Sequence, residues 1–250
     1  METPLLIGTA DRVRTLTLNR PEARNALDMN LLNLLTTELC DADADEAVDV
    51  IVLTGTDPAF CAGLDLKGLS SFARIPTDPG GTTPERSKPE RKPGAPTNPW
   101  LALRSMTKPV IGAVNGAAVT GGFELTLGCD FLIASDKAAF ADTHARVKVM
   151  PDGGLTGLLP QSIGLRRAKE MSLTGNFVDA EEALRLGLVN RVVPHDQLME
   201  TTLELAAKII KNDQAAVRNL KRIYDEGSRM TLAECFAMEH REHVAWGFPG

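Results

Sequence analysis

The sequence predicts an α/β fold that ends in a helical C-terminal part. Short apolar runs typical of buried parallel strands alternate with helical patterns before Pro151. Glycine-rich turns follow two of these runs, and after Pro151 almost every segment has helical periodicity. A chain of 250 residues is long enough to build a full core. We therefore expect a core over residues 1–195 and a C-terminal helical part over residues 196–250.

Several elements can be predicted from their local patterns. Polar and apolar residues alternate over 12–18 and predict the first strand. Asp28 is a suitable N-cap for a helix whose leucines recur from Leu31 to Leu39. Lys108-Pro109 ends a helical pattern that covers residues 100–106. The other expected strands are 50–54, 110–114, 131–134 and 188–193, and the other expected helices are 121–128, 165–173, 180–186, 197–212, 215–226 and 232–245.

The segment 75–99 differs from the rest of the chain. It contains seven of the fifteen prolines and few large apolar residues. Proline lacks an amide hydrogen and fixes φ, so this stretch is expected to be a long loop within the core rather than a helix or an inner strand. Such loops often cover binding pockets, and a solvated insert without function is the alternative.

Composition excludes several classes of function. Lys and Arg number 27 against 33 Asp and Glu, and the basic residues do not cluster, so nucleic acid is not an expected partner. No apolar run approaches 18 residues, so no membrane span is expected. The four cysteines are far apart and no basic, apolar leader is visible, which favours reduced thiols in the cytoplasm. His240 and His243 lack a third ligand nearby, so no metal site is expected.

Two glycine-rich turns are the candidates for a binding site. Residues 60–66 read FCAGLDL after the 50–54 strand, and residues 115–125 read NGAAVTGGFEL after the 110–114 strand. Glycine allows close backbone approach, and the second turn leads into a helix whose first amides are free to bind an anion. Neither turn has the spacing of a phosphate-binding loop or of a dinucleotide-binding fingerprint.

In this order and spacing, the two turns resemble the enoyl-CoA hydratase/isomerase (crotonase) family. The resemblance extends over essentially the whole chain. It is also carried by Asn19-Arg20-Pro21, Asn25-Ala26-Leu27, Leu173-Thr174-Gly175, Ala180-Glu181-Glu182-Ala183 and Gly187-Leu188-Val189. It implies a spiral of ββα units and a C-terminal helical part that builds homotrimers, often paired into hexamers. It also implies an acyl-CoA substrate, with coenzyme A as part of that substrate and no separate cofactor.

The resemblance implies a set of binding residues. Two backbone amides, carried over to Ala62 and Gly121, are expected to hold the thioester oxygen and to favour an enolate. Gly63, Leu64 and Asp65 are expected to line the side that binds CoA. Arg24 and Lys67 are candidate partners for the CoA phosphates, and solvated surface charges are the alternative for both.

Glu124 is the expected principal acid and base, because the family has a catalytic glutamate three residues after the glycine that matches Gly121. Apolar neighbours would raise its pKa and suit it to proton transfer near neutrality. Typical hydratases have a second glutamate twenty residues later, where this chain has His144. A neutral imidazole can accept a proton from water, and a pocket wall without proton transfer is the alternative. Asp142 is expected to face away from His144 if both lie on one strand.

These residues predict an enoyl-CoA hydratase-like enzyme that forms an enolate, with fatty acid metabolism as the expected setting. The departure at His144 leaves two alternatives open. One is an enoyl-CoA isomerase that uses Glu124 alone, and the other is a non-catalytic acyl-CoA-binding protein. A second departure is Asp152, where the family commonly has the first glycine of a glycine-rich helix start.

Overall fold

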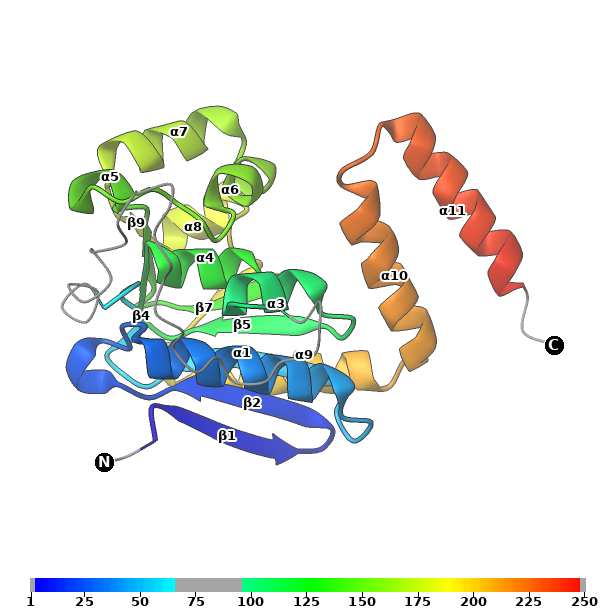
Figure 1. The fold of residues 1–250 in the computed structure, drawn as a ribbon, viewed down its shortest axis with the longest axis horizontal. Coiled ribbons are helices and arrows are strands. Elements are labelled where there is room, and N and C mark those ends of the chain that lie inside the picture. Colours follow the sequence, from blue (N-terminus) through cyan, green and yellow to red (C-terminus); the bar gives the residue numbers. More distant parts are fainter. Residues whose placement is uncertain (1–2, 66–95, 248–250) are drawn as a thin grey trace, which may run out of the picture.

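Two β-sheets form the centre of the fold in the computed structural model, which describes residues 3–65 and 96–247 (Figure 1). In the larger sheet β1 runs antiparallel to β2, and all other neighbours are parallel. Its strands, in spatial order, are β1 (Leu5–Ala10), β2 (Val13–Leu18), β3 (Val50–Gly55), β5 (Val110–Val114), β7 (Phe131–Ser135) and β10 (Arg191–Val193).

The smaller sheet shows how the chain repeats one unit. Its strands, in spatial order, are β4 (Ala59–Cys61), β6 (Ala117–Val119), β8 (Ala139–Ala141) and β9 (Val178–Asp179). Each of the pairs β3–β4, β5–β6 and β7–β8 sends its first strand to the larger sheet and its second to the smaller one. A helix follows β6 and β8 directly. This is the spiral of ββα units that the sequence resemblance implies.

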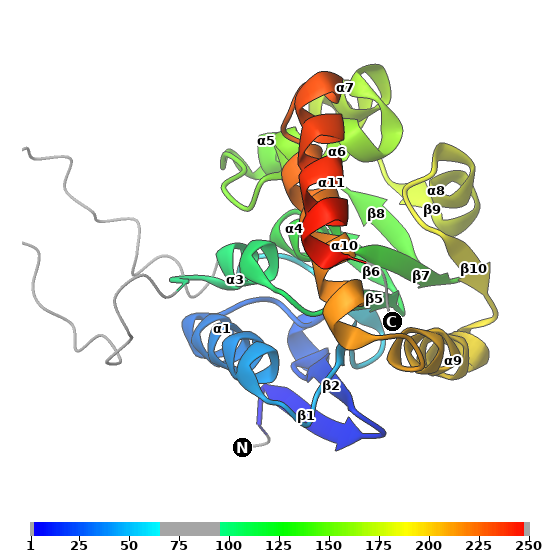
Figure 2. The ribbon, with the colours of Figure 1, turned by 90° about the vertical axis from the view of Figure 1, so that its right-hand side faces the viewer.

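The helices cover both faces of the larger sheet. Helices α1 (Met29–Ala44), α3 (Pro99–Ser105) and α4 (Gly121–Leu127) pack on one face. Helix α9 (Leu198–Ile210) packs on the other, so that α1 and α9 lie on opposite sides of the strands in Figure 2. The other helices are the 3-10 turns Pro21–Ala23 and His195–Gln197 and the α-helices α5 (His144–Val147), α6 (Leu155–Ile163), α7 (Leu165–Thr174), α8 (Ala180–Leu186), α10 (Gln214–Gly227) and α11 (Leu232–Trp246).

Strand β3 shows why the inner strands are apolar throughout. Successive side chains of a strand point to opposite faces. Ile51 and Leu53 therefore join the core beneath α1, whereas Val50 and Val52 join the core beneath α9. All six residues of β3 are buried. The uninterrupted apolar run of this strand is the consequence of having helices on both sides.

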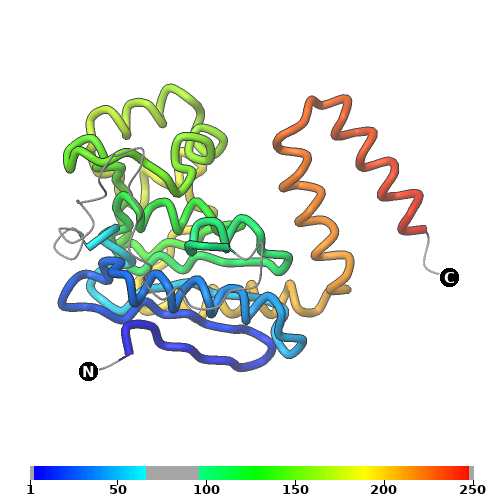
Figure 3. The backbone as a smooth tube through the Cα atoms, in the orientation of Figure 1, coloured from blue at the N-terminus to red at the C-terminus, as the bar shows by residue number. Residues whose placement is uncertain are grey.

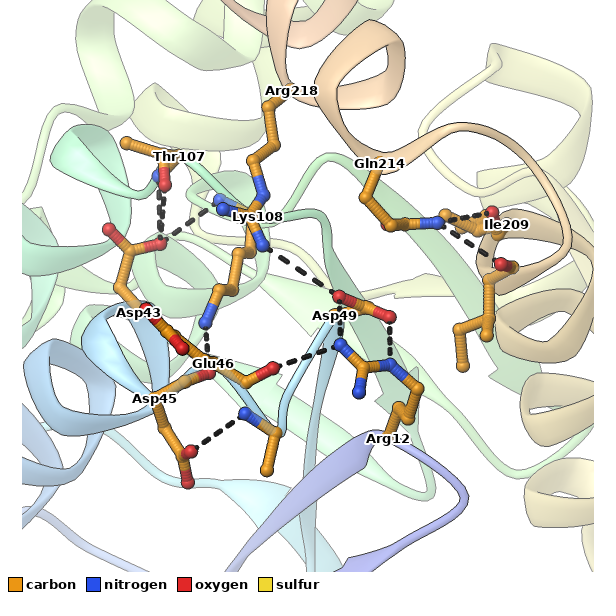
Figure 4. Close-up of polar contacts among 12 residues, drawn as sticks. Arg12, Asp43, Asp45, Glu46, Asp49, Thr107, Lys108, Ile209, Gln214 and Arg218 are labelled. Carbon is orange, nitrogen blue, oxygen red and sulfur yellow. Dashed lines mark hydrogen bonds and ion pairs between the residues drawn. The ribbon is translucent and has the colours of Figure 1, made fainter.

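The C-terminal hairpin of α10 and α11 extends away from the sheets, as the tube in Figure 3 shows. One of its contacts with the core is at Asp49, which precedes β3 and is buried (Figure 4), and another is the ion pair of Lys221 with Asp130. Arg12 donates a hydrogen bond to Asp49 Oδ1 at 2.9 Å, and Arg218 of α10 lies 3.7 Å from the same oxygen. The hydrogen bonding by Arg12 lowers the pKa of Asp49, so the carboxylate is charged at neutral pH. Lys108 is buried nearby and donates to two carbonyls at the end of α1.

Most predicted elements are confirmed, with ends that shift by a few residues. Asp28 caps α1 by accepting a hydrogen bond from the amide of Leu31 at 2.8 Å. Among the described residues, the elements that local patterns did not reveal are β1, α5, α6, the two 3-10 turns and the four strands of the smaller sheet. Those four strands are two or three residues long, too short for a periodic signal. In the segment 75–99, residues 75–95 lie outside the described residues, and Pro99 begins α3.

Asn25 joins the chain before α1 to the turn between β3 and β4. It is fully buried and has a φ of 56°, a left-handed conformation that asparagine tolerates. Its Nδ2 donates to the carbonyls of Thr56 and Ala59, both at 2.7 Å, and its Oδ1 accepts from the amide of Arg20 at 2.8 Å. The side-chain amide thus bonds three backbone groups from two segments, and the bond to Ala59 is fully buried.

We expect Asn25→Ala to lower the free energy of unfolding by about 3 kcal/mol, because it removes three hydrogen bonds and leaves the Ala59 carbonyl only the longer bond from Asn115 Nδ2 at 3.3 Å. Urea denaturation of the purified protein would measure the change. Asn30→Ala, at an exposed position of α1, is the matched control and should change stability by less than about 0.5 kcal/mol. Equal stability of the two variants would contradict this role of Asn25.

Candidate active site

A cavity of about 160 Å³ lies where the N-terminus of α4 meets the loop after β4. Helix α3 and the segment from α5 to the start of α6 complete its wall. Its lining is largely apolar and includes three titratable residues, Glu124, His144 and Asp152, of which Glu124 and His144 face each other. The lining residues are Ala62, Leu64, Trp100, Thr120, Gly121, Glu124, Thr143, His144, Val147, Val149, Met150, Asp152 and Gly153.

The cavity exists because two backbone segments approach each other closely. A β-carbon at Gly122 would lie 2.2 Å from the carbonyl oxygen of Cys61. One at Gly63 would lie 2.2 Å from Thr120 Oγ1, and Gly63 also has a φ of +91°. Only glycine fits these positions without displacement of the backbone. The two glycine-rich turns of the sequence are therefore neighbours in space.

Two backbone amides lie side by side at this contact, and one of them belongs to a different residue from the one that the resemblance implies. Ala62 was expected to be an oxyanion donor, which is wrong, because its amide donates to the carbonyl of Arg24 at 3.0 Å. Leu64 and Leu27 form a parallel β-bridge, in which the Leu27 amide donates to the Gly63 carbonyl and the Asp65 amide donates to the Leu27 carbonyl. In such a bridge the residues on either side of Leu64 bond to Leu27, so the N–H of Leu64 itself points to the opposite side of the loop.

The amide of Leu64 therefore lies beside the first residue of α4. A β-carbon at Gly121 would lie 3.7 Å from the Leu64 nitrogen. The amide of Gly121 has no partner within its helix, because the first N–H groups of a helix have none. The N–H of Gly121 shares its peptide plane with the carbonyl of Thr120, which accepts from the amide of Glu124 at 2.9 Å. Trp100 of α3 donates its indole N–H to the carbonyl of Gly121 at 3.0 Å and so holds the next peptide of α4. Sequence patterns gave no signal for Trp100.

Glu124 lies one turn into α4 and is only 3% exposed. Its Oε1 accepts hydrogen bonds from the amides of Gly153 at 2.7 Å and Leu155 at 3.4 Å. Burial raises the pKa of Glu124 and outweighs the opposing effects of His144 and of these two amides. The carboxyl group is thus anchored through one oxygen, while Oε2 faces the cavity.

The glycines after Asp152 have a defined role in this anchor. A β-carbon at Gly153 would lie 2.7 Å from the carboxyl carbon of Glu124 and 2.7 Å from Trp100. Arg104 of α3 donates to the carbonyl of Gly153 at 2.6 Å and holds the turn from the other side. Asp152 itself lines the cavity. The sequence shows the two glycines of this turn, but their spacing does not reveal that the turn contacts Glu124.

His144 lies across the cavity from Glu124, with 3.7 Å between its Nε2 and Glu124 Oε2. Asp142 was expected to face away from His144, which is wrong, because Asp142 Oδ1 lies 2.6 Å from His144 Nδ1. The reason is that β8 ends at Ala141 and α5 begins at His144, so strand alternation does not apply between them. Sequence reasoning thus missed a direct contact between the two side chains.

The remaining predicted residues are more dispersed. Asp65 pairs with Arg20 at 3.0 Å, and Arg24 is exposed in the turn before α1; neither is among the residues that line the cavity. Lys67 lies outside the described residues. Burial raises the pKa of the Cys61 thiol to about 12, as expected for a packed and unreactive cysteine.

The chain is similar in sequence and in structure to known proteins. The sequence profile of the enoyl-CoA hydratase/isomerase family matches residues 8–247. A mitochondrial enoyl-CoA hydratase of Pongo abelii is 35% identical over 234 residues, which cover 94% of this chain and 76% of that protein.

Two crystal structures are similar over nearly their whole length. The enoyl-CoA hydratase of Mycobacterium tuberculosis H37Rv is 49% identical, with a TM-score of 0.75 and coverage of 94% of this chain and 93% of that one. A monofunctional enoyl-CoA isomerase from M. smegmatis is 34% identical, with a TM-score of 0.76 and coverage of 94% and 98%. Since the profile spans nearly the whole chain and the relatives share its fold, this protein belongs to the enoyl-CoA hydratase/isomerase family.

Proposed function

We propose that this protein hydrates the double bond of a 2-enoyl-CoA thioester. The observation that carries the proposal is the pair of Glu124 and His144, which face each other at 3.7 Å in a cavity beside two backbone amides. A water oxygen about 2.8 Å from both side chains would fit between them with normal hydrogen bonds. The family and its named hydratases support this substrate class.

The amides of Leu64 and Gly121 are the proposed donors to the thioester oxygen. Addition of water to the double bond builds negative charge on that oxygen, and donors held in place stabilise the charge without reorganisation. The N-terminus of α4 adds a partial positive charge at the same point. The hydrogen bond from the Glu124 amide to the Thr120 carbonyl supports this role, because it holds the peptide plane that carries the Gly121 N–H.

Glu124 and His144 are the proposed acid and base. Neutral His144 takes a proton from water while the oxygen bonds to the β-carbon, and protonated Glu124 then gives its proton to the α-carbon of the enolate. The product has gained one water, and the proton left on His144 returns to Glu124 to restore the starting state. The raised pKa of Glu124 supports this assignment, because it keeps the carboxyl group protonated closer to neutral pH.

Isomerisation by Glu124 alone is the second candidate, since an enoyl-CoA isomerase is among the similar structures. One base would remove a proton from C2 of a 3-enoyl thioester and return it to C4, with a dienolate conjugated to the remaining double bond as the intermediate. No water would be added. Fatty acid metabolism in the cytoplasm is the proposed setting for either reaction, and the wide spacing of the four cysteines along the sequence fits a reducing compartment.

Self-association is also part of the proposal, with a homotrimer as the basic unit and a hexamer as its pair. The α10–α11 hairpin extends from the core and exposes large apolar side chains that a single chain leaves in water. A groove of about 560 Å³ runs between the two helices. The exposed residues are Leu220, Tyr224, Leu232, Phe236, Val244 and Trp246.

The direct test of the reaction is incubation with 2-enoyl- and 3-enoyl-CoA esters in deuterated water, followed by mass spectrometry. Hydration predicts the mass of one added water on the 2-enoyl ester. Deuterium uptake with double-bond migration and no added water would favour the isomerase. Binding of the esters without either change would overturn both and favour an acyl-CoA-binding protein.

We expect Glu124→Gln to lower kcat for any turnover at least about 100-fold, because the amide cannot donate or accept the transferred proton. Binding of a saturated acyl-CoA, measured by calorimetry, should change less than about threefold. Glu200→Gln, at an exposed position of α9, is the control and should retain full activity. Unchanged turnover of Glu124→Gln would remove this residue from the mechanism.

His144→Ala should separate the two reactions. Hydration should fall at least about 100-fold because no base remains for water, whereas migration of a 3-enoyl double bond should largely survive. Both rates can be followed by absorbance and mass spectrometry on the same samples. His240→Ala, exposed on α11, is the control. A variant that still hydrates at the original rate would assign His144 to the pocket wall.

In light scattering after size-exclusion chromatography, we expect a mass of three or six times the 26.9 kDa of one chain. Phe236→Asp should shift this mass towards one chain, because it puts a charge into the proposed contact. Ile7→Asp, exposed on the edge strand β1, is the control and should leave the mass unchanged. A wild-type protein with the mass of one chain would refute the proposal.

A further inference from the structure

Asp142 is a buried carboxylate that the proposed reaction does not yet use. It is 2% exposed, and its Oδ1 lies 2.6 Å from His144 Nδ1 and accepts from the His144 amide at 3.1 Å. The hydroxyl of Ser172 on α7 is a further hydrogen-bond donor to this carboxylate. Burial alone would raise the pKa of Asp142, but the hydrogen bonds from His144 and Ser172 outweigh it and lower the pKa.

An ionised carboxylate can only accept hydrogen bonds, so the nitrogen that faces it must carry a proton. His144 therefore donates through Nδ1, and in the neutral ring Nε2 has the free electron pair. Nε2 is the nitrogen that faces Glu124 Oε2 at 3.7 Å. Without such a partner, a neutral imidazole can place its proton on either nitrogen, and the form with Nε2–H could not accept a proton from water.

Backbone hydrogen bonds fix the position of Asp142 relative to the N-terminus of α4. The amide of Thr120 donates to the carbonyl of Ala141 at 3.0 Å, which joins the residue before Gly121 to the residue before Asp142. Strand β8 is held between β6 and β9, so the end of this strand is fixed on both sides. The orientation of the imidazole is therefore tied to the same framework that orients the α4 N-terminus.

We propose that Asp142 is the positioning residue that holds His144 in the Nδ1–H form, with its Nε2 turned to Glu124 and to the water that is added. The carboxylate also stabilises the imidazolium that forms when the ring takes a proton. Asp142 does not exchange protons with the substrate. The catalytic meaning of this assignment rests on the proposed hydration, whereas the state of the ring can be tested without it.

The first test is ¹⁵N NMR of the protein labelled at its four histidines, at a pH where the rings are neutral. The His144 signals are identified by their loss in His144→Gln. We expect the proton on Nδ1 in the wild type and a shift towards Nε2–H or a mixture in Asp142→Asn, whose amide can donate to Nδ1. A wild-type ring with its proton on Nε2, or an unchanged ring in Asp142→Asn, would overturn the proposal.

The second test is the kinetics of hydration by Asp142→Asn. We expect kcat to fall at least about 100-fold while KM changes less than about threefold, because the substrate does not touch Asp142. Asp11→Asn, in the exposed turn between β1 and β2, is the matched control and should behave as the wild type. A rise in KM with unchanged kcat would show a structural role only and overturn the proposal. If the wild type hydrates no enoyl-CoA, the proposed function fails, and the NMR result alone decides the role of Asp142.

Discussion

The close approach of the loop after β4 to the N-terminus of α4 is the constraint on which the site depends. Gly63 and Gly122 allow it, because a β-carbon at either position would lie 2.2 Å from an atom of the other segment. The contact brings the amides of Leu64 and Gly121 side by side and sets Glu124 one helical turn away. Buried Asn25 holds the turn before the loop in place through three hydrogen bonds. A loop on a rigid scaffold is the usual location of a site that needs donors in fixed positions.

Around this contact, the carboxyl group of Glu124, the imidazole of His144 and the first turn of α4 are each held by a further group. Glu124 is anchored by the amide of Gly153, whose carbonyl is in turn held by Arg104. His144 is held by Asp142, and Gly121 by Trp100. A buried carboxyl group or imidazole without such partners would be costly and mobile. Here the partners leave one side of the Glu124 carboxyl group and of the His144 imidazole turned to the cavity, where each could contact a substrate and a water molecule.

The fold could be predicted from the sequence to a large extent, because burial leaves a periodic signature. The apolar runs of β3 and β5 and the leucine pattern of α1 reflect the faces that they cover, and their positions are confirmed. The short strands of the smaller sheet carry no such signature and depend on pairing with distant segments. Within the site, Glu124 and His144 were placed by resemblance in motif and spacing, and the cavity contains both.

Two residues show the limit of local reasoning. The two glycine-rich turns, the glutamate after the second turn and the histidine twenty residues later could be recognised in the sequence, because they are defined by spacing along the chain, which folding does not change. By contrast, the hydrogen bond from the Ala62 amide to the Arg24 carbonyl, which leaves the Leu64 amide as the donor at the site, depends on the folded backbone. So does the contact of Asp142 with His144, since the strand ends at Ala141. Hydrogen-bond direction depends on where a backbone segment turns and which distant segment lies beside it, and neither property is encoded in residue spacing.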